Sequence, residues 1–246
     1  ADRAPGDVQA EWLPRIASGD AVVAMGAIGT PFVLDAAAAD LLVLERDDRL
    51  FALPTGAATL TPQPSVDGSR RLCSVDWSRS DEIVLAEGPE GWHAVNAAFD
   101  RGALGTAAQL VGLADRMLEM TVDYVKQRQQ FDVPIGSFQA VKHHLADALL
   151  RLEFAKPVVH NAAWSTDHDL PTRSRDASMA KCFATEAATT VARTALQCHG
   201  AIGYTVEYDL HLWMKRVWAL AASWGDAAYH RNRVGVAVLG TQDPVS

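Results

Sequence analysis

The sequence predicts an α+β protein in which a small antiparallel β domain precedes an antiparallel helical bundle. Two patterns support this division. Between residues 21 and 94, short apolar runs alternate with turn residues, which is typical of strands. From residue 98 onward, apolar residues recur at the three-to-four-residue spacing of one helix face. A hydrophobic content of 49% over 246 residues is enough for a full core.

The first part of the chain is short. Residues 8–17, VQAEWLPRIA, predict a helix that ends at Ser18 and Gly19. We therefore divide the chain into residues 1–20, a β domain over residues 21–95 and a bundle over residues 96–246. The expected strands are the runs AVVAM (21–25), LLVLE (41–45), RLFAL (49–53), RRLCSVDW (70–77) and EIVLA (82–86).

Five helices are expected in the bundle. They cover residues 98–130, 137–168, 175–198, 206–222 and 225–239. Pro157 should kink the second helix, because proline lacks the backbone donor. Gly200 and Gly203 should end the third, which is rich in alanine and suited to close packing against two neighbours.

Composition argues against several kinds of partner. A net charge of −8 disfavours binding to a nucleic-acid backbone, and no run of 18 apolar residues predicts a membrane span. Without a signal-peptide pattern at its start, the sequence predicts a cytoplasmic protein. The three cysteines and eight histidines are scattered, and the adjacent His143 and His144 point to different sides of a helix. Free thiols and no metal site are therefore expected.

The stretch from residue 128 to 139, RQQFDVPIGSFQ, has the most specific chemistry. Arg128 is followed by two glutamines, which places a fixed cation and two amides at a helix end, where a phosphate can bind. The VPIG sequence that follows cannot continue a helix. Ser137 is then expected to cap the next helix.

Two motifs together resemble the acyl-CoA dehydrogenases, which are FAD enzymes. The pattern R-x-x-F-x-x-x-I-x-x-x-Q, formed by Arg128, Phe131, Ile135 and Gln139, is similar to the start of the second long helix in that family's C-terminal domain. The sequence QCHGAIGY at residues 197–204 resembles the family's Q-x-x-G-G-x-G-Y loop. The spacing between the two motifs also fits. The alternative is that each set consists of ordinary helix-end residues.

The resemblance implies a cofactor and a set of residues that bind it. In the family, residues of these motifs hold the pyrophosphate and adenine of the FAD of a neighbouring subunit. Glycines there let the backbone approach the ligand, and a planar guanidinium suits a diphosphate. The implied FAD-binding residues are Arg128, Gln130, Phe131, Phe138, Gln139, Gln197, Gly200, Gly203 and Asp226. Asp226 replaces a family threonine and brings negative charge toward the expected phosphate.

The catalytic base of the family has no counterpart at its usual position. A glutamate is expected 27 residues beyond Gln197, where this chain has Trp224, and an indole cannot accept the substrate proton. Some members carry the base before an arginine that opens the first long helix, which corresponds here to Asp100. Asp100 is either that base or a helix N-terminal acid that stabilises the helix dipole.

The β domain also departs from the family. Residues 25–31, MGAIGTP, stand where the family has a T-E-P-x-A-G-S-D loop beside the flavin. Thr30 is either a hydroxyl donor to the flavin or part of an ordinary turn. The family's N-terminal helical domain is largely missing, with residues 1–20 as its remnant. Either the sequence is truncated or the subunit is naturally short.

Three hypotheses for function remain open. The chain resembles a reduced subunit of the α2β2 acyl-CoA dehydrogenases of actinobacterial steroid breakdown. It would then supply the adenine half of a FAD site to a homologous partner that brings the base, with an acyl-CoA substrate and an electron-transfer acceptor. Alternatively, it is a self-sufficient dehydrogenase or oxidase using Asp100. Thirdly, it is a catalytically silent assembly or acyl-CoA-binding protein. The sequence does not identify the acyl group.

Overall fold

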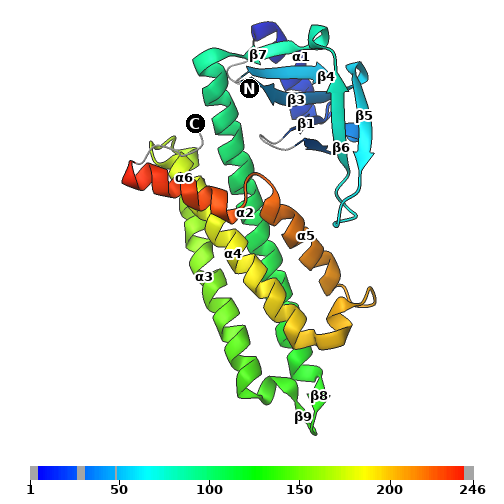
Figure 1. Ribbon diagram of the computed structural model, residues 1–246, viewed down its shortest axis with the longest axis vertical. Helices are drawn as coiled ribbons and strands as arrows, with labels where there is room; N and C mark the ends of the chain where they lie inside the picture. The colour runs from blue at the N-terminus through cyan, green and yellow to red at the C-terminus, as the bar shows by residue number, and fades with distance from the viewer. Residues whose placement is uncertain (1–4, 27–30, 48, 241–246) are drawn as a thin grey trace. The chain divides into compact units, whose positions relative to one another are not determined.

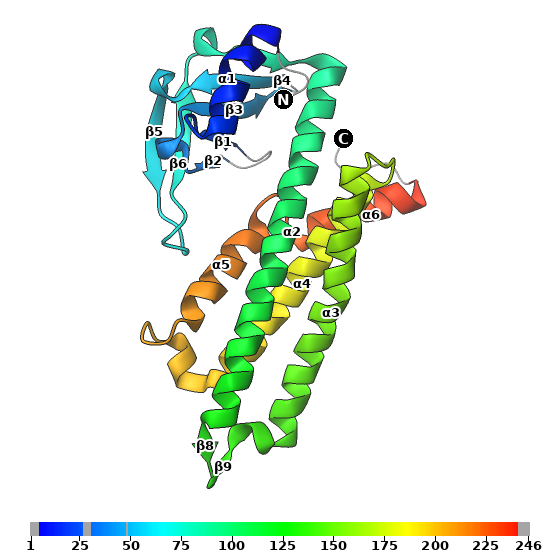
Figure 2. The same ribbon diagram turned by 180° about the vertical axis from the view of Figure 1, so that it is seen from behind.

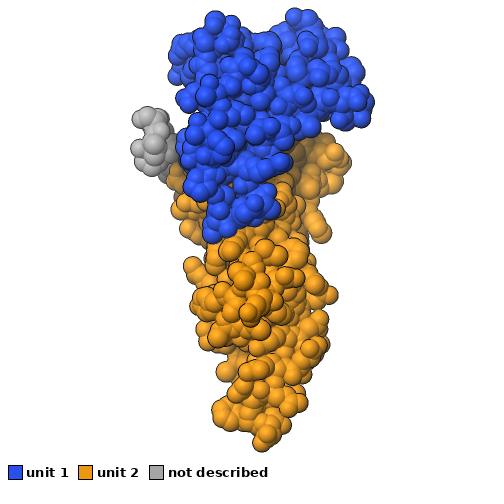
Figure 3. Space-filling view, turned by 90° about the vertical axis from the view of Figure 1, so that its right-hand side faces the viewer, with its two compact units in different colours: residues 1–99 blue, residues 100–246 orange. Residues whose placement is uncertain are grey.

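The protein is described here from a computed structural model, in which residues 5–26, 31–47 and 49–240 are placed. The chain separates into two compact units, Ala1–Phe99 and Asp100–Ser246, coloured separately in Figure 3. The boundary falls inside the long helix α2 (Gly88–Gln127). Each unit has a hydrophobic core of its own.

The first unit combines one helix with two small sheets. Helix α1 (Gly6–Ser18) precedes the strands. The strands are β1 (Val23–Met25), β2 (Phe32–Leu34), β3 (Leu41–Arg46), β4 (Arg49–Pro54), β5 (Ala58–Gln63), β6 (Leu72–Trp77) and β7 (Ile83–Ala86). One sheet has the order β1-β3-β4-β7 and the other β2-β6-β5. All these pairs are antiparallel except β1 with β3, which is parallel and departs from the predicted antiparallel sheet.

Side-chain alternation along the strands divides the core of this unit into two layers. Phe51 and Leu53 of β4 pack with Cys73 of the other sheet, in a cluster that joins the inner faces of both sheets. Ala52, between them in sequence, faces the opposite side and packs with Trp12 of α1. Successive residues of a strand point to opposite faces, so one strand serves both layers.

Each of the five predicted strand runs overlaps one observed strand, namely β1, β3, β4, β6 or β7, but β2 and β5 were missed. Strand β2 has three residues, too few for a visible alternation. Strand β5, ATLTPQ, is mostly polar and contains Pro62. Proline is tolerated there because β5 is an edge strand of its sheet.

The second unit is an antiparallel helical bundle, as predicted (Figure 1). After α2 come the short strands β8 (Gln129–Gln130) and β9 (Val133–Pro134), then helices α3 (Gln139–Asp167), α4 (Arg173–His199), α5 (Leu210–Ala222) and α6 (Ala227–Leu239). Helices α2, α3 and α4 lie side by side in both views (Figures 1 and 2). Their shared core includes Leu110 and Met117 of α2, Leu152 of α3 and Val191 of α4.

Several predicted helix boundaries were wrong. Helix α2 begins at Gly88, ten residues before the expected start. Ser137 does not cap α3, because it lies in the 3-10 turn η4 (Ile135–Ser137) and Phe138 occupies the cap position without a side-chain hydrogen bond. Pro157, predicted to kink this helix, lies inside α3, which runs from Gln139 to Asp167.

Two kinds of feature are absent from the described residues. None of the described helices is long and apolar enough to cross a bilayer. In the same part of the chain, no group of three or more histidine, cysteine or acidic side chains is arranged to hold a metal ion.

The bundle core gives a matched pair of leucine substitutions on α3. Leu152 is fully buried, whereas Leu149 is 45% exposed. Leu152→Ala should lower the free energy of unfolding by about 2 to 5 kcal/mol, because it removes buried methyl groups and leaves a cavity. Leu149→Ala should lower it by less than about 1 kcal/mol. Urea unfolding followed by circular dichroism measures both, and equal losses would contradict the packing described here.

Candidate functional site

The two sequence motifs are held at the same end of the bundle (Figure 1). Tyr124, near the end of α2, stacks on His199, the last residue of α4, with ring centroids 4.3 Å apart and an interplanar angle of 24°. The Tyr124 hydroxyl donates to the His199 carbonyl oxygen at 3.4 Å. Arg128 follows Tyr124 by one helical turn, and Gly200 follows His199 directly. This contact therefore joins the first motif to the second.

A third ring fixes the stack. Tyr208 lies 4.8 Å from His199, centroid to centroid. The imidazole is only 4% exposed, and its Nδ1 donates to the Ala195 carbonyl at 2.8 Å. Burial lowers the pKa of His199, against the smaller effect of this hydrogen bond, which favours the neutral form of the ring. Its Nε2 finds no hydrogen-bond partner among the described residues.

The polar residues of the first motif are free to bind a ligand. Arg128, Gln130 and Gln139 are exposed. The Arg128 guanidinium forms no hydrogen bond or ion pair with any other described residue. Helix α3 begins eleven residues later, at Gln139, and the first N–H groups of a helix have no intrahelical partners. A guanidinium and a helix N-terminus suit a diphosphate.

The hairpin between these residues presents an aromatic side chain. Strands β8 and β9 are joined by Phe131 and Asp132, whose φ angles of 55° and 60° are both left-handed. Two-residue hairpin turns of this kind usually contain asparagine or glycine, so a phenylalanine here is strained. Phe131 is 87% exposed and meets Phe138 edge-on at 6.3 Å. Strain of this sort concentrates at binding sites, and an exposed ring of this kind suits stacking against a purine.

The two glycines of the second motif have different roles. Gly200 has φ 65° and ψ −139°, which only glycine adopts readily, and a Cβ atom there would meet nothing within 4 Å. Its backbone is open to a ligand, as is the exposed Gln197. Gly203 is buried, and a Cβ atom would lie 3.0 Å from Leu196 Cδ1 and 3.1 Å from His199 Cβ. Gly203 therefore packs the loop onto α4.

Trp224, predicted to occupy the position of the family's catalytic glutamate, lies elsewhere in the bundle. Trp224 sits in the loop between α5 and α6, and its indole lies against Gly102 of α2, where a Cβ atom would be 2.4 Å from Trp224 Cδ2. Gly102 precedes Arg128 by 26 residues, which is roughly 40 Å along a helix. The carbonyl of Trp224 accepts a hydrogen bond from His230 Nε2 at 2.7 Å. The Trp224 indole is thus packed against α2, and the Trp224 backbone is held by His230.

A buried lysine of α4 also holds the loop between α5 and α6 in place. Lys181 of α4 is fully buried, and its Nζ donates to the carbonyls of Gly225 at 2.9 Å and Ala221 at 3.1 Å and to Thr185 Oγ1 at 3.2 Å. Burial lowers the pKa of Lys181 to about 8, although the nearby Asp226 raises it. All three ammonium protons have acceptors, which is what a charged group needs away from water.

The loop around Trp224, with Lys181 and His230, forms a second location, distinct from the Arg128 end. Asp226 belongs to this second location. It is the N-cap of α6, and its Oδ1 accepts a hydrogen bond from the Tyr229 N–H at 2.8 Å. The residues predicted to bind the cofactor are therefore divided between two places. Thr30, the predicted hydroxyl donor, lies outside the described residues.

Asp100 is part of a buried ion pair. Arg233 Nη1 donates to Asp100 Oδ1 at 2.9 Å and to Ser178 Oγ at 3.0 Å, while Nη2 donates to Ser174 Oγ at 2.8 Å. The interpretation of Asp100 as a helix N-terminal acid was wrong, because α2 begins at Gly88 and Asp100 lies more than three turns inside it. The carboxylate links α2 to α6.

The sequence comparisons agree with the motif assignment. The profile of the acyl-CoA dehydrogenase C-terminal domain matches residues 89–239, most of the helical part of the chain. This chain belongs to the acyl-CoA dehydrogenase family. Similar members are the acyl-CoA dehydrogenases IpdE2 of Mycolicibacterium smegmatis, 34% identical over 206 residues, and of Mycobacterium tuberculosis, 33% identical over 207. The matches cover 84% of this chain but only 60% and 59% of the relatives.

Solved structures share the fold. Butyryl-CoA dehydrogenase from Megasphaera elsdenii superposes with a TM-score of 0.87 at 23% identity, over 96% of this chain and 73% of that one. The ChsE4-ChsE5 complex from Mycobacterium tuberculosis gives a TM-score of 0.81 at 23% identity, over 98% and 73%. A steroid acyl-CoA dehydrogenase variant gives 0.77 at 23%, over 89% and 62%.

In this acyl-CoA dehydrogenase chain, sequence reasoning missed the residues that hold the two locations in place. Tyr124, His199 and Tyr208 form the aromatic stack, and Lys181, His230 and Arg233 fix the second location. One signal was available: Lys181 interrupts an alanine-rich helix face, and a charge on a buried face requires partners.

His230 should make the stability of this chain depend on pH. Burial, assisted by Lys181 and Arg233 and opposed by Asp100 and the bond to Trp224, lowers the pKa of His230 to about 4 from its ordinary value of 6.5. Between pH 6.5 and 4 only the unfolded chain takes up this proton, so the free energy of unfolding should fall as the pH falls. His230→Gln keeps a donor without titrating. Chemical unfolding across this range should show wild type losing on the order of 2 to 3 kcal/mol more than the variant, whereas parallel losses would contradict the burial.

Proposed function

We propose that this chain is a subunit of a FAD-dependent acyl-CoA dehydrogenase that works with a homologous partner subunit. It would contribute the adenine and diphosphate half of a FAD site whose flavin ring and catalytic base belong to the partner. The proposal rests on the contrast between the two locations. The Arg128 end carries exposed donors that have no partners among the described residues, whereas an indole is fixed at residue 224, where the resemblance places the family's base.

The residues of the Arg128 end fit half of a FAD molecule. Arg128 and the start of α3 would hold the diphosphate. The exposed edge of Phe131 and Phe138 would contact the adenine, and the open backbone at Gly200 admits close approach. Amides of Gln130, Gln139 and Gln197 would add hydrogen bonds. Bound FAD would supply the hydride-accepting chemistry for introducing an α,β double bond into a CoA thioester.

Removal of the substrate's α proton also needs a carboxylate aimed at it. Trp224 cannot accept a proton, and the Asp100 carboxylate is held by Arg233. This arrangement favours a base from the partner over a self-sufficient enzyme that uses Asp100. The resemblance to heteromeric enzymes and the shared fold of the ChsE4-ChsE5 complex support the same assignment.

The substrate class and assembly are parts of the same proposal. The fold shared with a steroid acyl-CoA dehydrogenase favours the CoA thioester of a steroid-derived acid. We assign the chain to an assembly with two copies of each subunit, in which an electron-transfer protein reoxidises the flavin.

The flavin spectrum distinguishes this proposal from a silent assembly protein. The chain alone should bind little FAD, and co-expression with its partner should give a yellow complex. A partnered complex without flavin would favour the silent protein.

Arg128→Ala tests the cofactor half-site. Loss of a charge-assisted contact of roughly 1.5 to 3 kcal/mol should weaken FAD binding by the complex about 10- to 100-fold. Lys126→Ala removes an exposed cation from the same helix end and serves as the control. Flavin occupancy at limiting FAD, measured by absorbance, should fall for the first variant only. Unchanged occupancy of Arg128→Ala with intact helicity would rule the assignment out.

Asp100→Asn separates the partner's base from a base in this chain. A general base typically contributes about 10² to 10⁴-fold in rate. Because we assign Asp100 to the ion pair with Arg233, turnover of the complex should stay within a few-fold of wild type, while the free energy of unfolding falls by roughly 1 to 3 kcal/mol. Reduction of bound FAD by an acyl-CoA is the readout. A loss beyond about 100-fold with normal FAD content would transfer the catalytic role to Asp100.

A further inference from the structure

Three aromatic rings at the Arg128 end form a closed cluster in which each ring contacts the other two. The imidazole of His199 lies 4.3 Å from the Tyr124 ring and 4.8 Å from the Tyr208 ring, centroid to centroid. The two tyrosine rings are 6.0 Å apart and meet edge-on. Aromatic pairs at such distances attract each other beyond the area they bury. His199 therefore makes the two closer contacts of the three.

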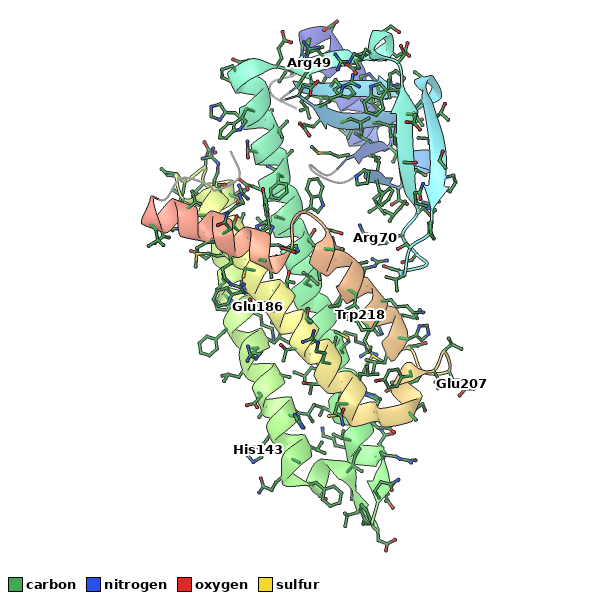
Figure 4. The ribbon with its side chains drawn as sticks, in the orientation of Figure 1. Arg49, Arg70, His143, Glu186, Glu207 and Trp218 are labelled. Carbon is green, nitrogen blue, oxygen red and sulfur yellow. The ribbon has the colours of Figure 1, made fainter. Side chains whose placement is uncertain are left out.

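The cluster joins three segments of the chain. Tyr124 lies near the end of α2, His199 is the last residue of α4, and Tyr208 lies in the connection between α4 and α5. The exposed Glu207, labelled in Figure 4, marks this connection next to Tyr208. Without the imidazole, only the edge contact between the two tyrosines would remain. His199 is thus the member that ties α4 and the connection to the end of α2.

The peptide between His199 and Gly200 is held on both sides. Its carbonyl accepts a hydrogen bond from the Tyr124 hydroxyl at 3.4 Å, and its N–H donates to the Leu196 carbonyl. The 3-10 turn η5 (Gly200–Tyr204) begins there. It folds back over His199, since a Cβ atom at Gly203 would lie 3.1 Å from His199 Cβ. These contacts fix the direction in which the open Gly200 backbone points.

The imidazole nitrogens are turned away from any ligand. Nδ1 donates to the Ala195 carbonyl, which belongs to α4 and accepts an intrahelical bond as well. Nε2 is buried and has no hydrogen-bond partner among the described residues. With an exposed fraction of only 4%, the side chain acts through packing and not through a polar contact with a cofactor.

We propose that His199 is a positioning residue of the cofactor half-site. Its ring holds the Gly200 backbone in a fixed place relative to Arg128, so that both meet the same FAD molecule. This inference rests on the proposed function and assigns to His199 neither a contact with FAD nor a proton transfer. Without the ring, the helix end and the turn would be ordered only when FAD binds, and that ordering reduces affinity.

Two substitutions at residue 199 test this role in the complex with the partner subunit. His199→Ala removes both ring contacts and should raise the FAD dissociation constant at least about tenfold. His199→Phe restores a ring without either nitrogen, so its dissociation constant should return to within about threefold of wild type. Titration of the flavin-free complex with FAD, followed by absorbance, measures both. The loss should appear in FAD affinity and not in turnover of an acyl-CoA by the FAD-saturated complex.

Leu152→Ala is the control for general destabilisation. Leu152 is fully buried in the bundle core and is not part of the aromatic cluster. Its substitution should leave the FAD dissociation constant within about twofold of wild type, although it destabilises the bundle. A rise as large as that of His199→Ala would reduce the effect to lost stability and overturn the proposal. Unchanged affinity in His199→Ala would overturn it directly, and a Phe variant as weak as the Ala variant would exclude the ring as the cause.

Tyr124→Phe provides a second route if His199→Ala does not assemble with the partner. It keeps the ring and removes only the hydroxyl that bonds the His199 carbonyl, so the FAD dissociation constant should rise about two- to tenfold. No rise would contradict the restraint on the peptide. Arg128→Ala, measured in parallel, separates the two proposals. Weakened FAD binding in Arg128→Ala alone would leave the half-site intact and remove the role of His199, whereas no effect in either variant would overturn both.

Discussion

The alanine face of α4 is the constraint on which both functional locations depend. Ala180, Ala184 and Ala188 are fully buried, and such small side chains let α2 and α3 approach α4 closely on either side. That approach brings His199, at one end of α4, against Tyr124 of α2. Earlier along the same helix, Lys181 donates to the Ala221 carbonyl in the last turn of α5 and to the Gly225 carbonyl in the loop that follows. A larger residue on this face would separate the helices and disturb both ends together.

The polar groups of the two locations differ in whether they have partners within the chain. Around Trp224 nearly every polar group has a partner inside the chain: the ammonium of Lys181 has three acceptors, and Arg233 is shared between Asp100 and two serines. Such a network is rigid and offers little to a ligand. At the Arg128 end the neutral aromatic stack provides rigidity instead, and the charged and amide groups remain exposed. Stability and recognition are thus assigned to different groups of residues.

The sequence predicted the α+β class, the approximate helices and the two motifs, because periodicity and local spacing carry that information. It failed where the deciding contact is distant in sequence. Asp100 and Arg233 are 133 residues apart, and Tyr124 and His199 are 75 apart. The hairpin at Phe131 was missed for a different reason, since its turn lacks the residues that usually mark one. Strand β2 was too short to show an alternation, and strand β5 is mostly polar.

The contact between Trp224 and Gly102 also limits which residues can replace Trp224. The indole fills the space over a glycine, so a glutamate at residue 224 would leave an apolar void against α2. Gly102 has no side chain with which to fill it, and Lys181 and His230 would still hold the loop in its present course. Introducing a base at residue 224 would therefore require changes at several sites together, because the single substitution leaves both the void and the course of the loop unchanged.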